Sequence, residues 1–220
     1  MILSEHVERY LHGLRPDRSP LMREMEELAD REGVPIVHWE TGRFLATLVR
    51  ATAPARVLEV GTAIGYSALH IAEELGDRGK LVTLERDPRR VEQARGFLGR
   101  AGVLERVEIV EGDALQTLPG LEGPFDILFL DATKGDYRRY LELAEPKASE
   151  RALLLIDNML MSGEVALGEA ESGNWSADNL AAARALNAEL MESPSWLGSV
   201  LPIGDGVAFA ARRAEATVLP

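Results

Sequence analysis

The sequence predicts an α/β fold built on a doubly wound, mostly parallel sheet, with helices before it and an antiparallel hairpin near its end. Short apolar runs alternate with helix-length segments through the middle of the chain, which is the pattern of right-handed βαβ units. The runs are continuously apolar, as in strands buried on both faces. Towards the C-terminus an Asp-Gly pair separates two further apolar runs, which indicates a hairpin.

The N-terminal part of the chain has a helical pattern. Ser19 and Pro20 mark a helix start, because serine is a good N-cap and proline fits the first turn. Gly33 ends that helix. A second helix is expected over residues 39–52, directly before Pro54.

The middle of the chain alternates between strands and helices. The expected strands are 56–60, 80–85, 107–111, 125–130 and 152–156. The expected helices are about 67–75, 88–101, 114–118 and 134–144. A loop over 159–178 and a helix over about 177–191 then precede two strands, 197–202 and 207–212, which flank Gly204-Asp205-Gly206.

The length of 220 residues suits one large α/β domain. We expect that domain to span 1–220, with an N-terminal helical cap over 1–52 and an α/β core over 53–212. The chain has no cysteine, which excludes disulfides, thiolate zinc sites and a cysteine nucleophile.

Charge and hydropathy restrict the partners. The formal net charge is -12, which disfavours nucleic acid and anionic membranes. No apolar run approaches the ~18 residues of a transmembrane helix, and the start MILSEHVERY does not have the pattern of a signal peptide. A cytoplasmic location without membrane contact is therefore expected.

Each of the five expected strands ends on an acidic residue. These are Glu59, Glu85, Asp113, Asp131 and Asp157. An open parallel sheet binds its ligands outside the carboxyl ends of its strands. A row of carboxylates there predicts a site for hydroxyls, amines and a metal ion.

The first strand leads into a glycine turn at Gly61 and Gly65, where the backbone can approach a ligand closely. The spacing is G-x-x-x-G, and Glu59 precedes it. The carboxylate of Glu59 would repel a pyrophosphate and suits a cationic ligand such as S-adenosylmethionine (SAM). Glu85 is placed to accept hydrogen bonds from both ribose hydroxyls; alternatively it is a surface residue beside Arg86.

Asp113 and Ala114 end the third strand, where an adenine amino group would lie. Asp113 could instead cap the helix that starts at Ala114, and the two roles can coexist.

Six segments, taken in order, resemble motifs of the cation-dependent class I O-methyltransferases, the catechol and caffeoyl-CoA O-methyltransferase family. They are LEVGTAIGYSAL, TLERD, EGDAL, FLDATKGDY, LIDNML and PIGDG. The resemblance covers about residues 20–212 and implies a Rossmann-like SAM-methyltransferase fold and a homodimer. The candidate cofactor-binding residues are Val37, Glu59, Gly61, Tyr66, Ser67, Glu85, Arg86, Asp113, Ala114 and Asp131.

Asp131, Asp157 and Asn158 end two neighbouring strands and form an all-oxygen ligand set, which suits Mg²⁺ or a similar divalent cation. An isolated aspartate there would more often cap a helix. Lys134, in D-x-x-K after Asp131, is the candidate general base, and the resemblance gives the matching lysine that role. The alternative is a solvated lysine.

The substrate side departs from the family pattern. Met161 stands where relatives often carry an aromatic residue. Some relatives carry an acidic residue just after the hairpin turn, whereas here the turn Asp205-Gly206 is followed by Val207. Trp175 lies in a polar loop, where a large aromatic has to pack on something. The candidate substrate contacts are His38, Trp39, Met161, Trp175 and Asp205.

These observations favour metal-dependent methyl transfer from SAM to a hydroxyl oxygen of a small catechol-like or hydroxycinnamoyl-type acceptor. The segments MEELADREGVPIV and GTAIGYSA also resemble bacterial enzymes that methylate 5-hydroxyuridine in tRNA. A basic path along the chain would support a tRNA substrate; its arginines would be Arg15, Arg18, Arg23 and Arg43. Two more hypotheses are a nicotinamide-dependent dehydrogenase and a non-catalytic SAM-binding protein.

Overall fold

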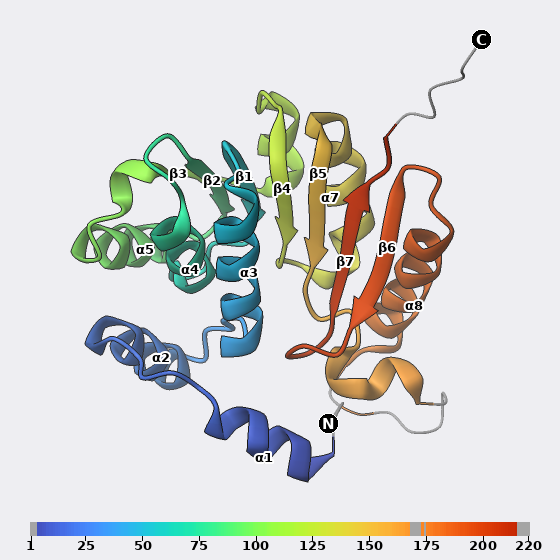
Figure 1. Cartoon of the computed structure of the whole chain (residues 1–220), viewed down its shortest axis with the longest axis horizontal. Coiled ribbons are helices and arrows are strands. Elements are labelled where there is room, and N and C mark those ends of the chain that lie inside the picture. Colours follow the sequence, from blue (N-terminus) through green and yellow to red (C-terminus); the bar gives the residue numbers. More distant parts are fainter. Residues whose placement is uncertain (1–3, 168–172, 174, 215–220) are drawn as a thin grey trace.

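The computed structural model describes residues 4–167, 173 and 175–214. A seven-stranded sheet runs through it in the order β3-β2-β1-β4-β5-β7-β6 (Figure 1). The strands are β1 (Arg56–Val60), β2 (Lys80–Glu85), β3 (Val107–Glu111), β4 (Phe125–Leu130), β5 (Ala148–Ile156), β6 (Trp196–Leu201) and β7 (Val207–Arg212). β1 to β5 pair in parallel, whereas β7 pairs antiparallel with both β5 and β6. The predicted parallel sheet with a C-terminal hairpin is confirmed.

Helices cover both faces of this sheet (Figure 1). The α-helices are α1 (Glu5–Gly13), α2 (Pro20–Glu32), α3 (Trp39–Thr52), α4 (Tyr66–Glu74), α5 (Pro88–Arg100), α6 (Ala114–Thr117), α7 (Tyr137–Ala144) and α8 (Ala177–Glu192). Short 3-10 turns are η1 (Leu104–Arg106), η2 (Leu118–Gly120), η3 (Lys134–Asp136), η4 (Glu145–Lys147) and η5 (Met161–Ala166). One apolar core joins α2 to α5 with the sheet, and a second joins α7 and α8 with its other face. None of the described helices is long and apolar enough to cross a membrane.

Capping residues set the boundaries of α2 and α5. The Oγ of Ser19 accepts a hydrogen bond from the backbone N–H of Met22, and α2 ends at Gly33 with a left-handed φ of 62°. Asp87 caps α5 through the N–H of Arg89 at 2.8 Å. These contacts satisfy amide groups that a helix start leaves without an intrahelical partner.

Three elements differ from the expected boundaries. β5 begins at Ala148 rather than 152, because Ala148 pairs with Phe125 of β4 and the strand continues through the polar residues Ser149, Glu150 and Arg151. The segment 134–144 divides into η3 and α7, and the expected loop over 159–178 contains η5. Residues 168–172 and 174 of that loop lie outside the described residues.

The order of the strands determines where the site lies. Chain connections run outwards from β1 in one direction and from β4 in the other, so the topology reverses between these two strands. Ligands of open α/β sheets bind in the crevice at such a switch point. The carboxyl ends of β1 and β4 therefore flank the expected binding site.

Candidate active site

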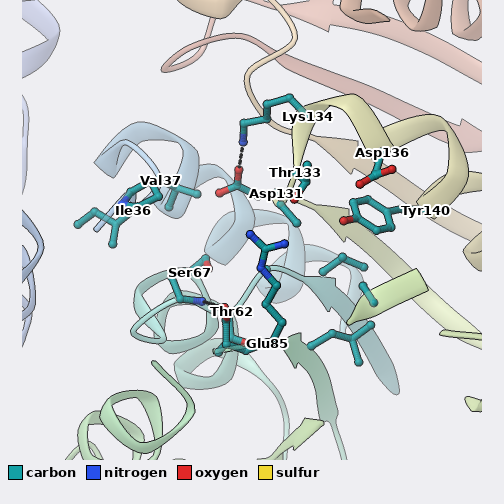
Figure 2. A pocket seen from close by; sticks show the side chains of 18 of the residues that line it. Ile36, Val37, Thr62, Ser67, Glu85, Asp131, Thr133, Lys134, Asp136 and Tyr140 are labelled. Atoms are coloured by element: carbon teal, nitrogen blue, oxygen red, sulfur yellow. Dashed lines mark hydrogen bonds and ion pairs between the residues drawn. The ribbon is translucent and has the colours of Figure 1, made fainter. Parts of the chain in front are cut away.

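A cavity of about 460 Å³ lies at the carboxyl ends of β1, β2, β3 and β4. Figure 2 shows its wall, with Ile36 and Val37 from the segment before α3 facing the Asp131–Lys134 side across the opening. Nine of the predicted cofactor residues line it: Val37, Gly61, Tyr66, Ser67, Glu85, Arg86, Asp113, Ala114 and Asp131. The structure thus brings together residues that are up to 94 positions apart, from Val37 to Asp131.

The glycine turn is a tight passage at the switch point. Gly61 has a φ of 106°, and a Cβ built on it would lie 2.0 Å from the backbone oxygen of Asp131. A side chain would need a strained backbone there and would collide with the end of β4. Glycine is therefore required for β1 and β4 to approach each other beneath the cavity.

Glu85 and Asp113 line the cavity, and each carboxylate also accepts hydrogen bonds from backbone N–H groups. The carboxylate of Glu85 accepts hydrogen bonds from the N–H groups of Ala63 at 2.8 Å and Asp87 at 2.9 Å. Asp113 caps α6 by accepting from Leu115 N–H at 2.9 Å, which is the capping role considered for it. Both residues line the cavity, so each carboxylate is held in place there by amide groups.

Glu59 differs from the other predicted cofactor residues. It lies one residue before the end of β1, which spans Arg56–Val60 as expected, and it pairs in register with Thr83 of β2. Its side chain is fully buried, accepts from Thr83 Oγ1 at 2.5 Å, and is not part of the cavity wall. Burial raises the pKa of Glu59 to about 7, because removal from water disfavours the charged form. Glu59 therefore lies beneath the cavity wall.

Tyr66 closes the cavity on the side of the N-terminal helices. Its hydroxyl donates to Glu26 Oε1 at 2.7 Å, and burial together with Glu26 raises the pKa of this phenol. Glu26 also binds Arg15, at 2.5 Å, and Arg18. Tyr66 consequently supplies a fixed aromatic ring to the cavity wall, because its hydroxyl is hydrogen-bonded to Glu26 of α2.

The Asp131–Lys134 pair lies at the opposite end of the cavity (Figure 2). The Nζ of Lys134 lies 2.7 Å from Oδ1 of Asp131, and the two side chains are only 17% and 18% exposed. Lys134 also lies 5.3 Å from the ring centroid of Tyr137. A partly buried amine with a directed partner is a positioned group, unlike the solvated lysine considered as the alternative.

Asp157 and Asn158 follow β5, beside the end of β4. The N–H of Asp157 donates to the carbonyl of Leu130 at 3.0 Å. Neither residue lines the 460 Å³ cavity. Burial and the charge of Asp131 raise the pKa of Asp157 to about 8, as expected for two carboxylates that share a site.

Two buried oxygens at this point need a partner. Among the described residues, Oδ1 of Asp157 and Oδ1 of Asn158 are enclosed without a hydrogen bond, which is costly for polar atoms. Among all the residues that the structure describes, no group of three His, Cys, Asp or Glu side chains is arranged to hold a metal ion. A cation here would therefore depend on the amide oxygen of Asn158 besides Asp131 and Asp157. This oxygen-only donor set fits a hard divalent cation.

The hairpin turn joins this region to the N-terminal segment. The carboxylate of Asp205 accepts hydrogen bonds from Ser162 Oγ at 2.8 Å and Asn158 Nδ2 at 3.3 Å. The Nε2 of His38 lies 3.4 Å from Asp205 Oδ2. The hydrogen bond from His38 holds the pKa of Asp205 below its usual range, and Asp205 raises the pKa of His38.

The remaining substrate candidates separate in the structure. Trp175 lines the cavity, and its backbone N–H donates to Glu164 Oε2 at 3.2 Å. Met161 is buried in the core on the α7 and α8 side, because η5 folds it inwards. Trp39 lines a separate cavity of about 260 Å³, where the guanidinium of Arg15 lies 5.7 Å from its ring. The structure therefore groups Trp175 with the cofactor residues and places Met161 and Trp39 elsewhere.

Several lining residues were not predicted. Thr62, Thr133, Asp136 and Tyr140 belong to the cavity wall. Tyr140 also packs in the core, with 4% of its surface exposed. All four lie in or directly after the glycine and D-x-x-K segments, so their proximity to those motifs was the signal that could have found them.

Comparison with known proteins places this arrangement in a family. The sequence profile described as O-methyltransferase matches residues 15–213. The chain belongs to the O-methyltransferase family. This O-methyltransferase is 43% identical to catechol O-methyltransferase of Mycobacterium tuberculosis over 67% of the chain and 65% of the relative, which is just under two thirds of that enzyme. It is 28% identical to caffeoyl-CoA O-methyltransferase of Stellaria longipes over 96% of the chain and 92% of the relative.

Solved structures of similar O-methyltransferases contain the cofactor or its product. The Bacillus cereus O-methyltransferase in complex with SAH has a TM-score of 0.81, with 26% identity and 94% and 97% of the two chains covered. The Streptomyces achromogenes O-methyltransferase TomG in complex with SAM has a TM-score of 0.82, with 26% identity and 96% and 100% covered. These findings identify the class as SAM-dependent O-methyl transfer and confirm the resemblance. They argue against the dehydrogenase and against a non-catalytic SAM-binding protein.

Proposed function

We propose that this O-methyltransferase uses a divalent cation to methylate a hydroxyl oxygen of a small catechol-like or hydroxycinnamoyl-type acceptor. The names of the relatives, catechol and caffeoyl-CoA O-methyltransferase, support this class of acceptor. The observation that carries the proposal is the pair of buried, unpartnered oxygens on Asp157 and Asn158, in the described part of the chain, beside the charge of Asp131.

The cavity residues hold SAM in this proposal. Glu85 would accept from the ribose hydroxyls and Asp113 would meet the adenine, while Val37 covers the cofactor. Ser67 and the amides of the Gly61 turn would bind the methionine part. Glu59, beneath the wall, would act through Ser67 and Thr83 rather than by direct contact. Fixed groups of this kind position the methyl donor for in-line displacement.

Asp131, Asp157 and Asn158 would hold the divalent cation, which supplies stabilisation of the deprotonated acceptor oxygen. Lys134 would take the hydroxyl proton on Nζ. In the arrangement seen, Nζ of Lys134 is engaged by Oδ1 of Asp131 at 2.7 Å. Binding of the cation by Asp131 would free Nζ of Lys134 to face the acceptor hydroxyl. Trp175 would exclude water from one side of the acceptor.

The geometry favours a small molecule over tRNA. Arg15 and Arg18 both pair with Glu26, and the guanidinium of Arg23 binds the carbonyl of Arg18 at 2.7 Å. Glu26 therefore offsets one of the two charges of Arg15 and Arg18 in the basic path that tRNA binding would need. A net charge of -12 acts in the same direction.

We further propose one domain over 1–220, a homodimer and a cytoplasmic location. Exposed apolar side chains on and after α1, Val7 at 44%, Tyr10 at 67% and Leu14 at 57%, support a surface that a second copy covers. Sedimentation at several protein concentrations tests the dimer; a concentration-independent monomer would contradict it.

The function is tested by a methyl-transfer screen against catechols, hydroxycinnamoyl esters and undermodified tRNA, with and without Mg²⁺. Mg²⁺-dependent methylation of a vicinal dihydroxy compound is expected. Activity on tRNA that falls steeply with salt would instead establish the RNA substrate.

A further inference from the structure

The Asp205 side chain lies against the amide of Asn158. Oδ2 of Asp205 and Nδ2 of Asn158 are 3.3 Å apart. An ionised carboxylate accepts hydrogen bonds and donates none, so the amide must present its NH₂ group to Asp205. The amide oxygen of Asn158 then points to the opposite side, where in the described structure it is buried without a partner, like Oδ1 of Asp157.

From this contact we propose that Asp205 is a positioning residue that holds the Asn158 amide with its oxygen facing the cation site. The inference rests on the proposed function, because it assumes that a divalent cation binds at Asp131, Asp157 and Asn158. Asn158 needs a residue that fixes its orientation, because its side-chain amide has an oxygen on one side and an NH₂ group on the other. If the amide were turned round, the NH₂ group would face the cation instead of the oxygen.

The backbone keeps Asp205 in place independently of its side chain. The N–H of Met159 donates to the carbonyl of Gly206 at 2.8 Å, and the N–H of Leu160 donates to the carbonyl of Asp205 at 3.0 Å. A Cβ on Gly206 would lie 2.5 Å from the Leu160 side chain, so the hairpin turn and the loop after β5 are in close contact. Truncating the Asp205 side chain should therefore leave the loop where it is.

The backbone of Asn158 makes it possible to test orientation separately from charge. Its φ is 61°, in the left-handed region that asparagine and aspartate both tolerate. A carboxylate at this position would have two equivalent oxygens and would need no partner to turn the right one forward. Asn158→Asp is therefore a background in which the proposed role of Asp205 disappears.

The experiment measures Mn²⁺ binding from the electron paramagnetic resonance signal of the free ion, without substrate. Asp205→Ala should weaken Mn²⁺ binding about 10- to 100-fold, which is typical for a residue that orients a metal ligand. Asp205→Asn keeps an acceptor oxygen and loses the charge, so it should restore most of the affinity. In the Asn158→Asp background, Asp205→Ala should change the affinity less than about threefold, because the coupling between the two positions is gone.

Ser162→Ala is the matched control, because it removes a hydrogen bond to the other oxygen of Asp205. It should leave Mn²⁺ affinity within about threefold of the wild type. Thermal unfolding of each variant checks that the fold is intact.

Equal losses in Asp205→Ala and Asp205→Asn, or equal losses in both backgrounds, would show that Asp205 acts through its charge and would overturn the inference. Unchanged Mn²⁺ binding in Asp205→Ala would overturn it as well. Absence of Mn²⁺ binding in the wild type would instead reject the metal-dependent function, and this inference with it.

Discussion

The Nζ of Lys134 lies 2.7 Å from Oδ1 of Asp131, at the end of the cavity where β4 stops. This contact joins the proposed general base to a proposed metal ligand, three residues apart in the sequence. In the proposed function, Lys134 would meet the hydroxyl of the methyl acceptor at this end of the cavity. The proposed base and the proposed cation site therefore meet at a single carboxylate.

Lys134→Met should lower kcat by at least about 10²-fold, because it removes the proton acceptor. SAM affinity should change little, since Lys134 lies at the acceptor end of the cavity. Single-turnover methyl transfer and equilibrium SAM binding measure the two quantities separately. Lys80→Met, at a lysine that binds the carbonyl of Glu105 far from the cavity, is the control with unchanged kcat. A normal kcat in Lys134→Met would remove this residue as the base.

Asp157→Asn should separate metal binding from folding. The pKa of Asp157 is raised to about 8, so in the metal-free protein its ionisation opposes folding as the pH rises from about 4 to 8. Asparagine avoids this cost, and the variant should melt at a higher temperature than the wild type at pH 8 without metal. Mg²⁺ should raise the Tm of the wild type but not of the variant. Equal Mg²⁺-induced shifts in both proteins would show that Asp157 is not a ligand.

Glu59→Gln should change how stability depends on pH. The folded-state pKa is about 7 against an ordinary value of 4.5. Below pH 4.5 both states hold the proton; between these values only the folded state does, so stability falls as pH rises. The loss approaches about 3 kcal/mol by pH 8, at about 1.4 kcal/mol per pKa unit. Glutamine removes this pH-dependent loss.

Urea unfolding of the wild type and Glu59→Gln at pH 4 to 8 makes the comparison. The free energy of unfolding of the variant should gain on that of the wild type between pH 4.5 and 7. Parallel pH profiles would mean that Glu59 ionises normally in the folded protein.

Gly61→Ala should destabilise the protein and weaken SAM binding. The new Cβ would lie 2.0 Å from the carbonyl of Asp131 at a φ of 106°, which should cost at least about 2 kcal/mol. Gly96→Ala is the contrasting control: nothing lies within 4 Å of its Cβ position in the exposed part of α5, and alanine there should stabilise by about 0.5–1 kcal/mol. Thermal unfolding of each variant with and without SAM measures both its stability and its SAM binding. Similar effects of the two substitutions would contradict the role given to the Gly61 turn.

Strand positions and helix caps were predictable from the sequence because they depend on local pattern. Ser19, Gly33 and Asp87 determine helix ends through their own backbone contacts. Adjacent strand ends could also be inferred, so the proximity of Asp131 and Asp157 was expected from β4 and β5 alone. The start of β5 was missed because its first residues are polar and partly exposed.

The depth of a side chain below the surface was harder to infer. Glu59 was predicted to face the cofactor at the end of its strand, yet its side chain is fully buried and does not line the cavity. Met161 and Trp39 were assigned to the substrate by their places in the sequence, whereas packing places Met161 in the core and Trp39 in a second cavity. The contact of Asp205 with Asn158 joins positions 47 apart and has no local signal.

The most direct measurement of the central claim is transfer of an isotopically labelled methyl group from SAM to catechol and caffeoyl-CoA, with the protein first stripped of metal by a chelator. Stripped protein should be inactive, Mg²⁺ should restore transfer to one of two adjacent hydroxyls, and Asp157→Asn should stay inactive at every Mg²⁺ concentration. Full methyl transfer by the stripped protein, or by Asp157→Asn, would contradict the account.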